Sequence, residues 1–127
     1  MAKHNAKWKE LPSKHDLEAA LNYRSLQLPS AKARKAVTQA GRIHAIQRIA
    51  KDVLRASRLP LLPTDERHVA EDLKKIRKGK PLSPVILIQG DLSKDHPAII
   101  ADGYHRMCAA CHADEDSPVA IVLVPAP

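Results

Sequence analysis

The stretch "IIADGYHRMCAAC", residues 99–111, joins two different hydrophobic patterns within one short segment. The aliphatic run at its start is typical of a buried strand, and the apolar spacing after Gly103 is typical of a helix. A glycine permits the sharp turn between the two. The stretch therefore predicts a strand, a turn and a helix, with Tyr104, His105 and Arg106 at the start of the helix.

The start of a helix suits anions, because its first backbone N–H groups are unpaired and its dipole is positive there. Arg106 adds a forked, permanently charged donor, and His105 adds a second donor or a proton carrier near neutral pH. We therefore expect ligand phosphates at Gly103, Tyr104, His105 and Arg106. The four glycines of the chain are placed so that neither G-x-x-x-x-G-K-[ST] nor G-x-G-x-x-G occurs.

The same residues also fit a purely structural role. Asp102 could cap the helix, Tyr104 could pack, and Arg106 could pair with Asp102 or Glu66. A carboxylate at Asp102 would also repel a phosphate unless a metal ion or a proton lay between them. Residue chemistry alone leaves the phosphate site and the structural role both open.

The segments around this turn predict an α+β fold. Val69, Leu73 and Ile76 have helical spacing, and Thr64 or Asp65 would cap the helix that carries them. The remaining segments predict strands at residues 83–89, 98–102 and 118–124 and a helix at residues 103–113. The change from a helical to an extended pattern is typical of a small α+β domain.

The first part of the chain predicts an α-helical segment. Helices are expected at residues 13–28, 30–41 and 44–57. The third is favoured most clearly, because apolar residues recur at helical spacing from Ile46 to Leu54. Pro60 and Pro63 then mark a boundary. We divide the chain into a basic helical segment, residues 1–58, and an α+β domain, residues 59–127.

The order of motifs in residues 57–124 resembles the ParB/sulfiredoxin-like superfamily, and in particular the ParB-like N-terminal domain. The resemblance rests on a polar helix leading through a glycine and a proline into a strand, and on a second strand that ends in a G-x-H-R turn and a helix. The matching residues are Gly79, Pro84, Gly103, His105, Arg106 and Ala109 or Ala110. The resemblance implies a small mixed β-sheet with helices, and a nucleotide whose phosphates lie on residues 103–106.

The chain departs from this superfamily in ways that limit what carries over. Sulfiredoxin-like enzymes have a catalytic cysteine where this chain has Tyr104, so sulfinic acid reduction is not expected. The helix-turn-helix module that follows this domain in ParB proteins has no counterpart in residues 59–127. The turn "DGYHR" is similar to that of free-serine kinases in the superfamily, which need a carboxylate base. The candidates for that base are Asp65, Glu66 and Asp102.

Two functions follow as expectations. The first is a ParB-like nucleotide- or phosphate-binding protein, with a nucleoside triphosphate and Mg²⁺ as its ligand and slow hydrolysis or phosphoryl transfer as its reaction. The alternative is a DNA- or RNA-binding protein without catalytic activity, because residues 1–58 hold thirteen Lys and Arg against four Asp and Glu. The candidate contacts to nucleic acid are Lys32, Arg34, Lys35, Arg42, Arg48, Lys51 and Arg55.

Composition excludes several other classes. No apolar run approaches the roughly 20 residues of a membrane helix, and the N-terminus does not have the pattern of a secretory signal. We therefore expect a cytoplasmic protein with no membrane partner, and a dimer is left open. Cys108 and Cys111 form C-x-x-C in the middle of the expected helix, where core packing is favoured over redox chemistry. No metal site is expected.

Overall fold

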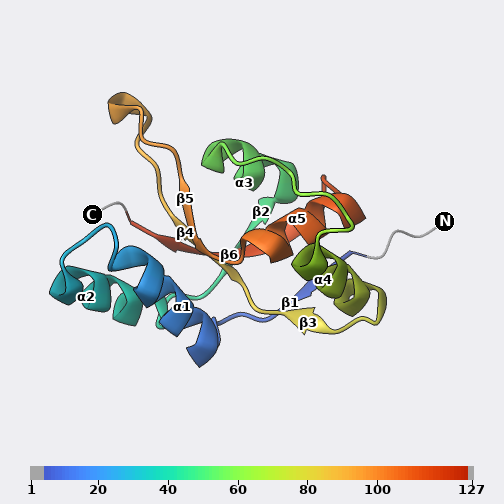
Figure 1. Cartoon of the computed structure of the whole chain (residues 1–127), viewed down its shortest axis with the longest axis horizontal. Helices are drawn as coiled ribbons and strands as arrows, with labels where there is room; N and C mark the ends of the chain where they lie inside the picture. The colour runs from blue at the N-terminus through green and yellow to red at the C-terminus, as the bar shows by residue number, and fades with distance from the viewer. Residues whose placement is uncertain (1–4, 126–127) are drawn as a thin grey trace.

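A four-stranded sheet forms the framework of the protein (Figure 1) in the computed structural model, which describes residues 5–125. In spatial order its strands are β2 (Ile46–Ile49), β6 (Pro118–Val124), β4 (Val85–Ile88) and β5 (Ile99–Asp102). Strand β6 runs parallel to β4 and antiparallel to β2, and β4 runs antiparallel to β5. The expected α+β class, with a small mixed sheet and helices, is confirmed.

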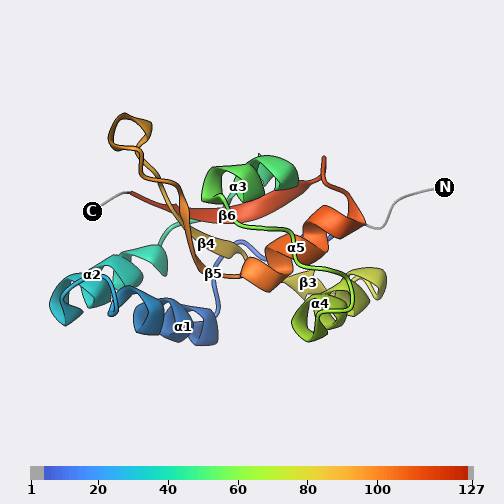
Figure 2. The same cartoon turned by 45° about the horizontal axis from the view of Figure 1, so that its top comes forward.

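Helices cover both faces of this sheet (Figure 2). On one face α3 (Ala50–Ser57) and α5 (Tyr104–Ala113) pack on the strands, and on the other face lie α1 (Lys14–Arg24) and α2 (Ser30–Ala40). Side chains alternate along a strand, so Val85 and Leu87 join the first core while Ile86 and Ile88 join the second. Burial on both faces explains why β4 is uniformly apolar.

A third packing unit closes one end of the molecule. Helix α4 (Arg67–Arg77) packs against α5, and β1 (Lys7–Trp8) pairs in parallel with β3 (Pro81–Leu82). Val69 of α4 meets Cys108 of α5 in this core. None of the helices within residues 5–125 is long and apolar enough to cross a membrane.

The elements expected around the opening stretch are present. The predicted ranges contain strands β4, β5 and β6 and helix α5. Helix α4 carries Val69, Leu73 and Ile76, the residues whose spacing predicted it. The cap of α4 is different from the prediction: Glu66, rather than Thr64 or Asp65, accepts a hydrogen bond from the Val69 N–H at 2.8 Å. Gly79 follows the last turn of α4 with a φ of 71°, which is the conformation that favours glycine after a helix.

The prediction of one helix over residues 44–57 is wrong in its first turn. Residues Ile46–Ile49 form β2, an edge strand of the sheet, and α3 begins only at Ala50. Backbone pairing with β6 outweighs the helical spacing of the apolar residues, and β-branched isoleucine suits a strand. The segment of residues 1–58 contains three helices as expected, but it also supplies β2 to the main sheet and β1 to the small one.

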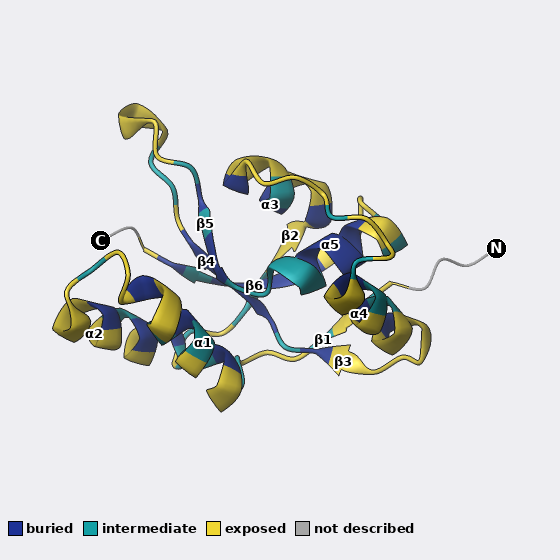
Figure 3. Cartoon of the chain, viewed as in Figure 1, coloured by how far each residue is buried: buried dark blue, intermediate teal, exposed yellow. Residues whose placement is uncertain are grey.

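A hairpin arm projects from the main sheet between β4 and β5 (Figure 1). It contains a short 3-10 helix, η1 (Leu92–Lys94), and a bridge between Asp91 and His96. Figure 3 shows that the tip of the arm is exposed, and Leu92 there is 88% exposed. The arm therefore adds little to the core.

Replacing Val53 by alanine is expected to lower the free energy of unfolding by about 2 kcal/mol, because Val53 is buried against the sheet. Unfolding should remain a single transition in urea, since α3 shares this core with α5. Leu92→Ala, which removes an exposed apolar side chain, is the control and should cost less than about 0.5 kcal/mol. Two separate transitions, of which Val53→Ala shifts only one, would contradict the shared core.

Candidate functional site

A polar cleft of about 530 Å³ lies where β5 ends and α5 begins. Side chains from the start of α1, from α4, from the segment around β3 and from the first turn of α5 line it. Three of the four residues expected to hold phosphates, Gly103, His105 and Arg106, line this cleft. The strand–turn–helix motif therefore opens into a hollow large enough for a small molecule.

Gly103 makes the turn into α5 geometrically feasible. Its φ is 105°, a conformation that other residues rarely adopt. A Cβ at this position would lie 2.8 Å from Nη2 of Arg106 and 3.1 Å from a methyl group of Val85. Among residues 5–125, no side chain caps the helix or accepts a hydrogen bond from its first amides, so the role considered for Asp102 as the cap is not found.

Arg106 is held by carboxylates of the protein. Its Nη2 lies 2.9 Å from Oδ2 of Asp102 and donates to the carbonyl oxygen of Pro84 at 3.3 Å, and its Nη1 lies 3.6 Å from Oδ1 of Asp16. The side chain is only 17% exposed, and its buried Nε has no hydrogen-bond partner among the described residues. The structural pairing of Arg106 with Asp102 is therefore confirmed. Glu66 instead lies 3.9 Å from Nε2 of His105.

Three carboxyl groups, Asp16, Asp72 and Asp102, lie deep in this cleft, and we call them the carboxyl floor. Burial raises the pKa of Asp102; the bond and charge of Arg106 oppose this, while the charge and hydrogen bond of Asp16 add to it. Burial also raises the pKa of Asp72, against the opposing charge of Lys75 at 3.8 Å. Burial thus favours the protonated forms of Asp72 and Asp102, whereas the nearby charges of Lys75 and Arg106 favour their ionised forms.

The outer part of the cleft is basic. Exposed Lys9, Lys75 and Lys80 line it, and we call them the basic rim. One exposed carboxylate, Glu71, also lines it and lies 3.5 Å from Nε of Arg67. Histidines from two elements stand close together there: the rings of His68 and His105 are 4.8 Å apart. The cleft therefore combines hydrogen-bond acceptors at its floor with cations at its rim.

The other predicted site residues lie outside this arrangement or have structural partners. Tyr104 does not line the cleft, and its hydroxyl donates to the carbonyl oxygen of Pro60. Asp65 is exposed and away from the cleft lining. Glu66 caps α4, and the hydrogen bond from Val69 lowers its pKa. Of the candidate bases, Asp102 alone lies on the cleft wall, where it is bonded to Arg106.

Sequence reasoning missed two members of the carboxyl floor as site residues. Asp16 was visible only as part of a helix start, and it does form a capping box with Ser13. Asp72 falls on the buried face of α4 between Val69 and Ile76. A carboxylate at apolar helical spacing is a usable signal, because buried charges are rare without a partner or a function.

The structure divides the candidate nucleic-acid contacts between surfaces. Lys32, Arg34 and Lys35 belong to α2, whereas Lys51 and Arg55 belong to α3 on the opposite face of the sheet; Arg42 follows α2 and Arg48 lies on β2. Two of them also have acidic partners, with Lys51 at 2.7 Å from Asp116 and Arg55 at 3.7 Å from Asp52. They do not gather on one helical surface.

Metal and thiol chemistry have little structural basis in the described part of the chain. Residues 5–125 contain no group of three or more His, Cys, Asp or Glu placed to hold a metal ion. The Mg²⁺ expected with a nucleoside triphosphate therefore finds no prepared ligand set among these residues. Cys108 and Cys111 are free and buried, and burial raises the pKa of Cys111 to about 11, which disfavours the reactive thiolate.

No protein-family model, curated protein or solved structure matches this chain. Functional inference therefore depends on the chemistry of the cleft.

Asp72→Asn is expected to stabilise the protein at pH 7. The folded-state pKa of Asp72 is raised, so the folded state binds more protons than the unfolded state just above the ordinary value of 3.8. The stability that the protonated Asp72 carboxyl contributes is fully present at low pH, and it is lost as the pH rises through the raised folded-state pKa. Urea unfolding from pH 4 to pH 8 should show a smaller decline for Asp72→Asn than for the wild type.

The exposed neighbour Glu71 supplies the matched control, since Glu71→Gln also removes one carboxylate from α4 at a side chain that is far more exposed. An Asp72→Asn protein that is less stable than the wild type at pH 7, with an unchanged pH profile, would refute this assignment.

Proposed function

We propose that the cleft binds a nucleotide or another phosphorylated small molecule. The observation that carries the proposal is the start of α5, a ten-residue helix with no side-chain cap, at a cleft lined by the basic rim of Lys9, Lys75 and Lys80. Amides at a helix start and lysine ammonium groups both favour phosphate oxygens. The resemblance to the ParB/sulfiredoxin-like superfamily implies the same ligand class at this turn.

In this proposal Arg106 positions the site and does not contact the phosphate. Its guanidinium already has Asp102 and Asp16 as partners. The phosphate is assigned to the rim and to the α5 amides, because the carboxyl floor would repel it. The floor accepts hydrogen bonds, so it suits the hydroxyl or amino groups of the ligand. A molecule with phosphate at one end and donors at the other, such as a nucleotide, meets both requirements.

Asp102 is assigned as the base for hydrolysis or phosphoryl transfer, because it directly precedes Gly103 and so lies next to the amides of α5 that would hold the phosphate. A carboxylate with a raised pKa accepts a proton from an attacking hydroxyl more readily than an ordinary one does. Asp102 lies on the cleft wall, whereas Glu66 is engaged at the cap of α4 and Asp65 lies outside the lining.

Calorimetric titration with ATP, GTP and inorganic phosphate tests the proposal. The double variant Lys75→Ala/Lys80→Ala should weaken binding about tenfold, because it removes two rim charges. The matched control is Lys74→Ala/Lys78→Ala, which removes two exposed lysines at the end of α4 that do not line the cleft. This variant should bind the ligand within about twofold of the wild-type affinity.

Two results would reject phosphate binding at the cleft. One is the absence of heat with every nucleotide and with phosphate, and the other is an equal loss in both double variants. Binding of DNA or RNA in a low-salt mobility assay, with no binding of mononucleotides, would favour the alternative function.

A further inference from the structure

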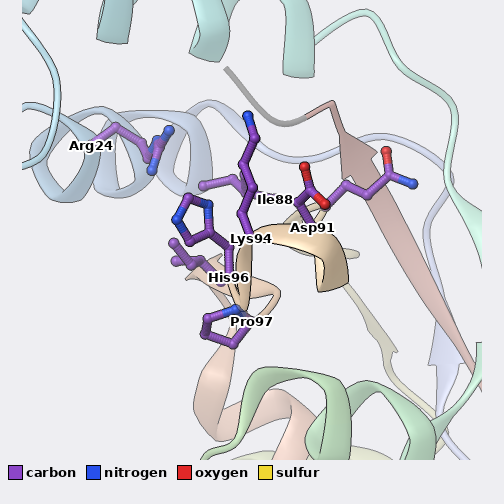
Figure 4. Close-up of a pocket in the computed structure, with 8 residues that line it drawn as sticks. Arg24, Ile88, Asp91, Lys94, His96 and Pro97 are labelled. Carbon is purple, nitrogen blue, oxygen red and sulfur yellow. The ribbon is translucent and has the colours of Figure 1, made fainter.

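A second hollow, of about 350 Å³, lies at the opposite end of α1 from the cleft (Figure 4). It is bounded by the last turn of α1 and by the hairpin arm between β4 and β5. Asp16 at the cleft and Arg24 at this hollow are eight residues apart on α1, which is about 12 Å along a helix axis. The two hollows have no lining residue in common.

Arg24 is the unusual residue of this second hollow. The residue is only 6% exposed, yet the one hydrogen bond that its guanidinium makes within residues 5–125 runs from Nη1 to the neutral Oε1 of Gln27, at 2.6 Å. Within residues 5–125, no carboxylate makes an ion pair with it, whereas buried Arg106 has two. Burial lowers the pKa of Arg24, but a guanidinium stays charged in proteins. The structure thus buries a cation without a counter-ion, which is unfavourable unless an anion joins it.

Other cations face the same space. Figure 4 shows Lys94 and His96 extending from the arm toward the hollow that Arg24 faces from α1. Asp91, the one carboxylate among the described residues of the wall, accepts hydrogen bonds from the backbone N–H and the hydroxyl of Ser93, at 3.0 and 2.5 Å. These bonds keep it ionised, so the wall holds the two permanent cations of Arg24 and Lys94 against one carboxylate. Charge complementarity therefore favours a negatively charged occupant.

The rest of the wall is mainly apolar. Ile88 and Ile99 from the two strands and Pro97 from the arm line it, and Gln89 adds one amide. A neighbouring groove that also includes Arg24 adds Lys32 and Lys35, and none of the described residues that line it is acidic. An inorganic ion would leave the apolar wall in contact with water, whereas an organic anion would cover it.

We propose that this hollow binds a small organic oxyanion, a carboxylate or a phosphate monoester with an apolar body. The planar fork of Arg24 binds two oxygens of the anionic group, Lys94 adds charge, His96 adds a ring nitrogen, and the apolar body packs on Ile88, Pro97 and Ile99. The volume is within the range of small-molecule sites. This site is independent of the proposed phosphate cleft.

Titrations with benzoate and phenyl phosphate, followed by amide chemical shifts and by the thermal midpoint, test this proposal. Both anions should perturb residues of the arm and of the end of α1 and should raise the midpoint, and neutral benzyl alcohol should do neither. A preference for one anion would distinguish carboxylate from phosphate recognition. Inorganic phosphate should bind more weakly than phenyl phosphate because it lacks the apolar body.

The variants separate this site from the cleft. Arg24→Met should weaken binding at least about tenfold, and Lys94→Ala about threefold. Lys94 lies on the projecting arm outside the core, so Lys94→Ala should fold even if Arg24→Met does not, and it then tests the proposal by itself. Leu92→Ala on the same arm and Lys75→Ala/Lys80→Ala in the cleft should leave the binding of benzoate, which carries no phosphate, unchanged. No binding at millimolar anion, or affinity unaffected by both Arg24→Met and Lys94→Ala, would overturn the proposal.

Discussion

The ion pairs of Arg106 join the parts of the chain that form the cleft. Its guanidinium lies between Asp102 at the end of β5 and Asp16 in the first turn of α1, and it also reaches the Pro84 carbonyl before β4. These contacts join residues that are far apart in the sequence, because Asp16 lies 86 residues before Asp102 and 90 residues before Arg106. Only the tertiary fold brings them together. Removing one member of such a buried group leaves the others without a counter-charge, which is far more costly than losing a surface pair.

Because Arg106 is already paired with two carboxylates, the turn after β5 contributes to function in a different way from the one the sequence suggests. A free arginine at a helix start would be a direct phosphate ligand, but here it holds two carboxyl groups in place. The phosphate-binding capacity proposed for the cleft therefore shifts to the amides of α5 and to the lysines of the rim. The carboxyl floor gives the cleft a second preference, for hydrogen-bond donors, and this narrows the ligand class. Arg24, which lacks such partners, represents the opposite situation in the same chain.

The local spacing of apolar residues predicted the strands and helices near the turn after β5. The features that the sequence did not predict, such as strand β2, depend on contacts between residues far apart in the chain. The apolar runs of β4, β5 and β6 and the helical spacing after Gly103 are each contained within about ten residues, so they were readable from sequence. Strand β2 was missed because its pairing with β6, some 70 residues away, cannot be read from the spacing of Ile46 and Ile49. The sequence offered Asp102 and Glu66 as partners of Arg106, and Asp102 is one of the two carboxylates that pair with it. The other, Asp16, is brought to Arg106 only by the tertiary fold.

A double-mutant cycle between Asp16 and Arg106 tests the central claim most directly. The free energies of unfolding of Asp16→Asn, Arg106→Gln and the double variant would be measured by urea titration at pH 7. A coupling of about 0.5–3 kcal/mol is predicted, because the two groups belong to one buried ion-pair cluster. Effects that add within about 0.3 kcal/mol would mean that the two side chains do not interact, and would contradict the assignment of Arg106 as the residue that holds the cleft together.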